Sequence, residues 1–132
     1  MTGSEQLART LAELADSKKA VDIVVLDMRE LVSYTDFLVI CTAGNERQAG
    51  AIREAVELGL KRGTGLLASR VEGSGQAGWT LLDYLDCVLH VFTEDARGRY
   101  RLEELWSDAP RIELRPAASS ASGGGGGRFE LE

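Results

Sequence analysis

The fold of this chain is decided by residues 79–93, WTLLDYLDCVLHVFT. Two strand-like runs, WTLLDY (79–84) and DCVLHVFT (86–93), are separated here by Leu85 alone. A connection this short favours an antiparallel hairpin, because parallel neighbours need a crossover of about a dozen residues or more. We therefore expect the second half of the chain to contain a hairpin that belongs to a larger sheet.

Alternation along the first of these runs predicts how its side chains divide between the two faces of the sheet. Trp79, Leu81 and Asp83 fall on one face, because successive side chains of a strand point in opposite directions. Tyr84 falls on the other face. An aromatic ring and an acid therefore share one face with a leucine.

The segments around the hairpin complete an α/β pattern. Leucines at positions 7, 11 and 14 recur at helical spacing, and the run VDIVVLDM is apolar on both faces, as in a covered strand. The predicted helices are 4–18, 45–62 and 101–106, and the other predicted strands are 21–28, 36–43 and 66–72. This order predicts a mixed sheet of about five strands with helices packed on it.

Helix ends are also visible in the sequence. Asn45 and Gln48 have the spacing of a capping box, and Gly63 follows two basic residues as a signal for a helix end. In the last predicted helix, we expect Leu102, Leu105 and Trp106 to face inward.

The length and composition indicate one domain and a tail. The chain has 132 residues, enough for one core and too few for two. We place the domain at residues 1–114. From residue 115 onward the chain is rich in Gly, Ser and Ala, with five consecutive glycines at 123–127. Such a segment buries too little apolar surface to order itself, so 115–132 is predicted to be disordered.

The charge balance excludes several classes of function. There are 15 Lys and Arg against 21 Asp and Glu, a formal net charge of −6, whereas a general nucleic-acid binder carries a basic surface. No run approaches the roughly 20 apolar residues of a membrane span, and the N-terminus lacks the apolar core of a secretory signal. We expect a cytoplasmic protein that has no direct nucleic-acid specificity and does not associate with a membrane.

No motif assembles a catalytic, cofactor or metal site. The glycine-rich segment 73–78, GSGQAG, precedes a strand rather than the helix that a dinucleotide-binding fingerprint needs. A D-x-D pair of metal-binding acids is missing from the sequence, and Cys87 and His90 are predicted to lie on opposite faces of their strand. Cys41 and Cys87 sit in apolar runs, which is typical of buried thiols.

Charge is unevenly distributed along the chain. Residues 71–96 contain five acids and no Lys or Arg, together with Trp79, Tyr84, His90 and Phe92. Aromatic anchors beside acids are typical of a surface that binds a basic partner. The alternative, in which Trp79 belongs to the core and the acids are merely solvated, is equally compatible with the sequence.

Several ordered blocks resemble the ribosomal silencing factor (Iojap, DUF143) family. They are DIVVLD (22–27), TDFLVI (35–40), NERQ (45–48), GWTLLDY (78–84), VLHVF (88–92) and RGRYRLEELW (97–106). The resemblance implies an α/β fold of nucleotidyltransferase-like topology that lacks the catalytic acids of the transferases. It therefore implies a protein that is not an enzyme and needs no cofactor.

The function implied by this resemblance is repression of translation. Family members bind ribosomal protein uL14 on the large ribosomal subunit and sterically block joining of the small subunit, which lowers translation when nutrients are scarce. Because uL14 is basic, an acidic aromatic face suits it. The alternatives are a metal-dependent nucleotidyltransferase-type enzyme and a generic dimeric adaptor for a basic protein. A homodimer that dissociates on binding uL14 would reconcile the dimeric adaptor with the uL14-binding repressor.

The resemblance also implies which residues contact the partner. The implied uL14-binding residues are Trp79, Leu81, Asp83, Tyr84, Asp86 and His90. In the closing block, Tyr100 and Trp106 are expected to hold the last helix against the sheet. The sequence departs from the family pattern at Leu85, which replaces a common glycine, and at Arg99, which replaces an aromatic residue.

Overall fold

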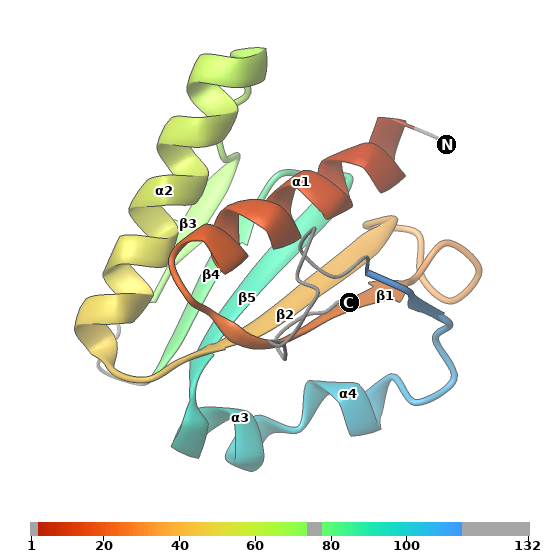
Figure 1. The fold of residues 1–132 in the computed structure, drawn as a ribbon. Coiled ribbons are helices and arrows are strands. Elements are labelled where there is room, and N and C mark those ends of the chain that lie inside the picture. The colour runs from red at the N-terminus through yellow and green to blue at the C-terminus, as the bar shows by residue number, and fades with distance from the viewer. Residues whose placement is uncertain (1–2, 74–77, 115–132) are drawn as a thin grey trace.

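The computed structural model describes residues 3–73 and 78–114. The helices are α1 (Gly3–Ser17), α2 (Glu46–Thr64), α3 (Glu94–Tyr100) and α4 (Leu102–Leu105). The strands are β1 (Val21–Asp27), β2 (Phe37–Ala43), β3 (Arg70–Glu72), β4 (Trp79–Asp83), β5 (Cys87–Thr93) and β6 (Arg111–Ile112). They form one six-stranded sheet in the order β3-β4-β5-β2-β1-β6 (Figure 1). The predicted α/β class with a mixed sheet is confirmed.

The predicted hairpin consists of β4 and β5. These strands pair antiparallel, from Trp79 opposite Phe92 to Asp83 opposite Val88. On its other side β5 runs parallel to β2, whereas the remaining neighbours pair antiparallel. The single parallel pair at the centre makes the sheet mixed.

Helices cover the two faces of the sheet unequally. The long helices α1 and α2 pack over one face (Figure 1), where Leu11 and Ile52 join Leu82 and Leu89 in the main core. The short helices α3 and α4 lie on the other side of the sheet, over a smaller buried cluster that includes Phe92. Part of this second face is left open to solvent.

Alternation in β5 decides which side chains enter which cluster. Cys87 and Leu89 belong to the core under α1 and α2, whereas Val88 and Phe92 belong to the second cluster. His90 hydrogen-bonds Trp79 on the second face, so Cys87 and His90 lie on opposite faces, as predicted. Cys41 and Cys87 are both buried free thiols, also as predicted.

The start of α2 confirms Asn45 as the N-cap, whereas the Gln48 side chain accepts from the N–H of Gly44 and not from that of Asn45. The side chain of Asn45 accepts a hydrogen bond from the backbone N–H of Gln48 at 2.8 Å. The Gln48 side-chain amide donates to the carbonyl oxygens of Lys18 and Lys19, each at 3.0 Å. One short polar motif therefore caps α2 and joins it to the end of α1.

Local geometry differs from the sequence prediction at four elements. The helix α2 continues to Thr64 and is capped by Gly65 at φ 74°, not by Gly63. The strand β3 comprises Arg70–Glu72 only. An unpredicted helix, α3, follows β5 directly, because the hydroxyl of Thr93 caps it by accepting from the N–H of Ala96. The short strand β6 was also not predicted.

The closing helix differs in what it buries. The prediction that Leu105 faces inward is wrong, since this side chain is 67% exposed. Leu102 and Trp106, in contrast, pack against the second cluster. A helix of only four residues has too few turns to bury all of its apolar side chains.

Two sequence features lie partly outside the described residues. These are positions 74–77 of the glycine-rich segment and the tail, 115–132. The strands that flank the glycine-rich segment, β3 and β4, pair antiparallel. The glycines therefore precede a strand and not a helix, as predicted. Among the described residues, no helix is both long and apolar enough to cross a membrane.

Candidate protein-binding groove

A groove of about 330 Å³ opens on the face of the sheet that carries α3 and α4. Strand residues form most of it, and the segments after β1 and α3 complete its walls. Its lining residues are Tyr34, Leu38, Arg70, Trp79, Leu81, Asp83, Val88, His90, Leu102, Leu105 and Trp106. Four of the six predicted contact residues therefore lie together: Trp79, Leu81, Asp83 and His90.

The indole of Trp79 is held between a hydrogen bond and neighbouring rings. Its Nε1–H donates to Nδ1 of His90 at 3.0 Å. Its ring centroid lies 5.2 Å from that of Phe92 and 4.5 Å from that of Tyr100, in tilted arrangements that aromatic rings favour. Trp79 packs against the second cluster and also lines the groove.

His90 is buried and neutral. Burial lowers the pKa of its imidazole to about 4, and the charge of Asp83 only partly opposes this shift. The ring therefore adds no positive charge to the groove near neutral pH. Its remaining role in the groove is that of a polar, uncharged side chain.

Asp83 supplies the acidic group of the groove. Its Oδ1 accepts a hydrogen bond from the N–H of Leu85 at 2.8 Å. Leu85 adopts a left-handed conformation, φ 70°, which glycine adopts more readily than a residue with a side chain. The carboxylate thus stabilises a strained turn, at a conformation that costs a side-chain-bearing residue about 1 kcal/mol.

Arg70 is a groove residue that the sequence reasoning missed. Its guanidinium lies 3.7 Å from the Asp83 carboxylate and 3.2 Å from that of Glu72. It stands one position before the stretch 71–96, which has no basic residue. The pairing of β3 with β4 brings Arg70 opposite Asp83. The register of β3 on β4 would have identified Arg70 as a neighbour of Asp83.

Tyr84 lies apart from the other predicted contact residues. It is buried on the opposite face of the sheet, within the core under α1 and α2. It borders a separate cavity of about 350 Å³, together with Leu58 and Val71. Alternation had placed Tyr84 away from Trp79, and the structure confirms that separation.

Asp86 also lies outside the groove, in the exposed turn between β4 and β5. Its carbonyl oxygen accepts hydrogen bonds from the N–H groups of Asp36 and Phe37. These bonds connect the turn to the start of β2. The backbone of Asp86 therefore has a structural role.

Two exposed apolar residues of the groove were not predicted as contact residues. Tyr34 is 64% exposed and Leu105 is 67% exposed. They belong to segments about 70 positions apart in the chain, and only the tertiary fold brings both to the groove. Exposed apolar side chains beside an open groove are typical of an interaction surface.

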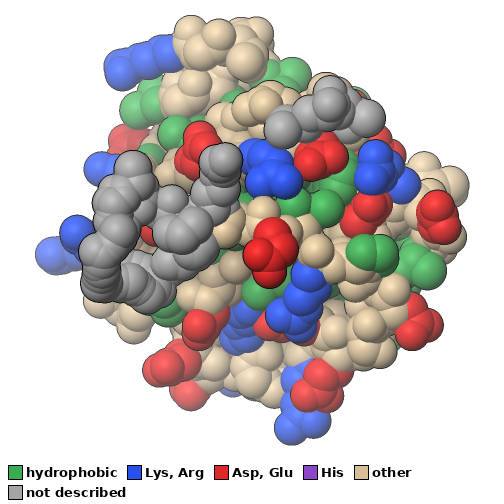
Figure 2. Space-filling view, turned by 45° about the vertical axis from the view of Figure 1, so that its right-hand side comes forward, with side chains coloured by type: hydrophobic (Ala, Val, Ile, Leu, Met, Phe, Trp, Pro, Cys, Tyr) green, Lys and Arg blue, Asp and Glu red, His purple; other side chains and the backbone are tan. Residues whose placement is uncertain are grey.

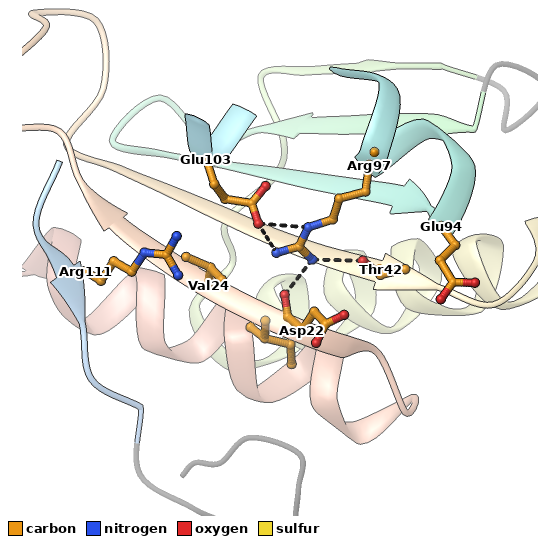
Figure 3. Close-up of a pocket in the computed structure, with 9 residues that line it drawn as sticks. Asp22, Val24, Thr42, Glu94, Arg97, Glu103 and Arg111 are labelled. Atoms are coloured by element: carbon orange, nitrogen blue, oxygen red, sulfur yellow. Dashed lines mark hydrogen bonds and ion pairs between the residues drawn. The ribbon is translucent and has the colours of Figure 1, made fainter. Parts of the chain in front are cut away.

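Arg97 forms a polar junction beside β1, separate from the groove (Figure 3). Its guanidinium donates to the carbonyl oxygen of Asp22, to Oγ1 of Thr42 at 2.8 Å and to the carboxylate of Glu103. Burial alone would raise the pKa of Glu103, but its hydrogen bonds and the charge of Arg97 hold that pKa below its ordinary value. This one side chain therefore ties α3 and the start of α4 to β1 and β2.

The two cysteines are held as thiols in the interior. Burial raises the pKa of Cys41 and of Cys87 to about 12, so neither is a thiolate near neutral pH. Within residues 3–73 and 78–114, no three His, Cys, Asp or Glu side chains converge as a metal site would require. On the face shown in Figure 2, acidic and basic side chains are interspersed with small apolar areas.

Comparison with known protein families identifies the family to which the chain belongs. The family described as "Ribosomal silencing factor during starvation" matches residues 2–125. This chain belongs to the ribosomal silencing factor family. Its members are regulatory, ribosome-associated factors, and membership supports a role in repressing translation.

Individual relatives of the chain agree with this family. The ribosomal silencing factor of Halalkalibacterium halodurans is 37% identical over 116 residues, which cover 88% of this chain and 98% of the relative. That of Bacillus subtilis is 34% identical, covering 83% of this chain and 92% of the relative. The crystal structure of a Chromobacterium violaceum protein is similar with a TM-score of 0.76 and 28% identity, covering 80% of this chain and 88% of that one.

Proposed function

We propose that this member of the silencing factor family binds ribosomal protein uL14 on the large subunit through the groove and thereby blocks joining of the small subunit. Translation would then fall when nutrients are limited. The observation that carries the proposal is the composition of the groove, where Trp79, Leu81 and Asp83 lie side by side with exposed Leu105.

The physical features of the groove suit a protein partner. Apolar and aromatic walls supply contact area, and the partly exposed carboxylate of Asp83 favours a basic residue at its end. Tyr34 and Leu105 are exposed apolar side chains of the same lining. The net charge of −6 disfavours adhesion to bare RNA, so it directs the chain toward a basic protein on the same particle.

The proposal describes a cytoplasmic, non-enzymatic factor. Steric occlusion needs a stable surface contact and no reacting group, which is consistent with thiols held at a pKa of about 12. The exposed groove residues also suit a homodimer that dissociates when uL14 binds, because both partners would cover the same apolar side chains. Competition between the two states would then lower the apparent affinity for uL14 at high protein concentration.

A pair of matched variants tests the proposal. Asp83→Asn keeps the oxygen that accepts from Leu85 but removes the charge from the groove. Glu54→Gln makes the same change of charge on an exposed side chain of α2. We expect Asp83→Asn to weaken binding to purified uL14 about tenfold, the worth of a lost charged contact of about 1.4 kcal/mol. Glu54→Gln should bind like the unchanged chain.

The functional consequence is read by sedimentation of mixed ribosomal subunits. The unchanged chain and Glu54→Gln should both shift 70S particles to free subunits, and Asp83→Asn should do so only at higher concentration. If both variants bind uL14 and prevent joining equally well, the groove is not the contact surface. Failure of the unchanged chain to prevent joining would reject the function itself.

A further inference from the structure

The position of the proton on His90 is set by Trp79. The indole N–H donates to Nδ1 of His90 at 3.0 Å. In a neutral imidazole, one nitrogen accepts hydrogen bonds and the other carries the proton. Because Nδ1 is the acceptor here, the proton lies on Nε2, and that atom is a hydrogen-bond donor.

This donor is accessible from the groove. His90 is one of the residues that line the groove. Among the described residues, the buried side-chain N and O atoms without a partner are Nε of Arg9 and Oη of Tyr84. Nε2 of His90 is not among these buried atoms, although it donates a hydrogen bond to no described residue. We infer that Nε2 is exposed to the groove that His90 lines.

The pair is rigid because Trp79 is itself fixed. Its ring lies against Phe92 and Tyr100, and His90 stacks nearly parallel to Phe92 with an interplanar angle of 9°. Turning the indole away would break these ring contacts together with the hydrogen bond. A fixed donor costs little conformational entropy when a partner binds, which favours specificity.

We propose that His90, oriented by Trp79, donates a hydrogen bond from Nε2–H to an uncharged carbonyl oxygen of the partner protein. This inference rests on the proposed function, because it takes the groove to be the binding surface. An uncharged acceptor fits because the carboxylate of Asp83 lines the same groove and repels an anion, while Arg70 is already paired with two acids. Trp79 is then a positioning residue, and His90 makes the contact.

Nuclear magnetic resonance of the full chain can test both parts, because His90 is its only histidine. Long-range proton–nitrogen spectra should show the Nε2–H form alone in the unchanged chain. Addition of purified uL14 should move the Nε2 proton downfield and slow its exchange with water.

Two variants separate positioning from packing. Trp79→Phe keeps an aromatic ring but loses the indole N–H, so a measurable fraction of the Nδ1–H form should appear. Its affinity for uL14 should fall about three- to tenfold, the range for one neutral hydrogen bond. Tyr100→Phe keeps the ring that contacts Trp79 and should change neither the tautomer nor the affinity.

The outcomes distinguish this inference from the proposed function. An Nδ1–H form in the unchanged chain, or an unaltered tautomer in Trp79→Phe, overturns the positioning role. Binding of uL14 through Asp83 without any change at the Nε2 proton overturns the proposed contact but leaves the proposed function standing. If the unchanged chain does not bind uL14, the contact falls together with that function, while the tautomer is still measured independently.

Discussion

Tyr84 carries a polar atom that the fold leaves without a partner. The side chain is 5% exposed, and its hydroxyl makes no hydrogen bond with the described residues. Burial, with a further contribution from the charge of Glu57, raises its pKa to about 12. A buried hydroxyl without a partner costs about 1–3 kcal/mol.

Removal of this hydroxyl should therefore stabilise the protein. We expect Tyr84→Phe to raise the free energy of unfolding by about 1 kcal/mol, because the ring contacts remain and the unpaired atom is removed. Urea denaturation measures the change. Tyr34→Phe removes a hydroxyl from a side chain that is 64% exposed, and it should leave stability unaltered. A loss of stability in Tyr84→Phe would show that the hydroxyl has a partner in solution.

At the level of elements, the start of β4 depends on a glycine. Gly78 adopts φ +77°, and a Cβ placed there would lie 2.5 Å from Oγ1 of Thr93 and 2.9 Å from Cβ of Ala96. Both the backbone conformation and the close approach of α3 therefore exclude a side chain. Trp79 follows directly, so this glycine also positions the groove.

Two glycine substitutions should have opposite effects on stability. Gly78→Ala is expected to lower the free energy of unfolding by about 2 kcal/mol or more, through backbone strain and overpacking. Gly98 lies inside α3, and an added methyl group would meet no described atom within 4 Å apart from those of its chain neighbours and its own helix backbone. Gly98→Ala should therefore raise stability by about 0.5–1 kcal/mol. Thermal unfolding of both variants tests this contrast, and equal effects would contradict it.

For the whole molecule, stability should depend on pH through the single histidine. Burial lowers the pKa of His90 to about 4 from an ordinary value of 6.5, so the unfolded chain binds more protons between these two values. The stability contributed by neutral His90 is complete above about pH 6.5 and is lost as the pH falls toward 4. The loss is on the order of 3 kcal/mol, given 1.36 kcal/mol per pKa unit.

Denaturation across this range of pH measures the effect, with His90→Phe as the control. The unfolding free energy of the unchanged chain should fall between pH 6.5 and 4, and the variant should show a much flatter profile there. Below about pH 4, Asp27 and Glu103 should continue the loss in both proteins, because their pKa values are held below the ordinary range. Equal slopes for the two proteins above pH 4 would contradict the assignment to His90.

The local parts of the fold could be predicted because they depend on neighbours in the chain. Alternation separated Trp79 from Tyr84, the capping pair marked the start of α2, and the short connection at Leu85 predicted the hairpin. The small helix α3 was missed, because its signal is little more than the cap at Thr93. Weak local signals of this kind are resolved by packing.

The sequence by itself determined the family, the α/β class and the face on which Trp79, Leu81 and Asp83 lie, since these follow from an ordered motif and a period of two. Only the tertiary structure decided that Arg70 and Leu105 complete the groove and that Tyr84 belongs to the core. The reason is physical. Alternation and capping act over a few residues, whereas strand order and burial depend on contacts between segments far apart in the chain. The acidic, aromatic stretch suggested a binding surface, but the groove is formed only where this stretch lies beside segments that are distant in the chain.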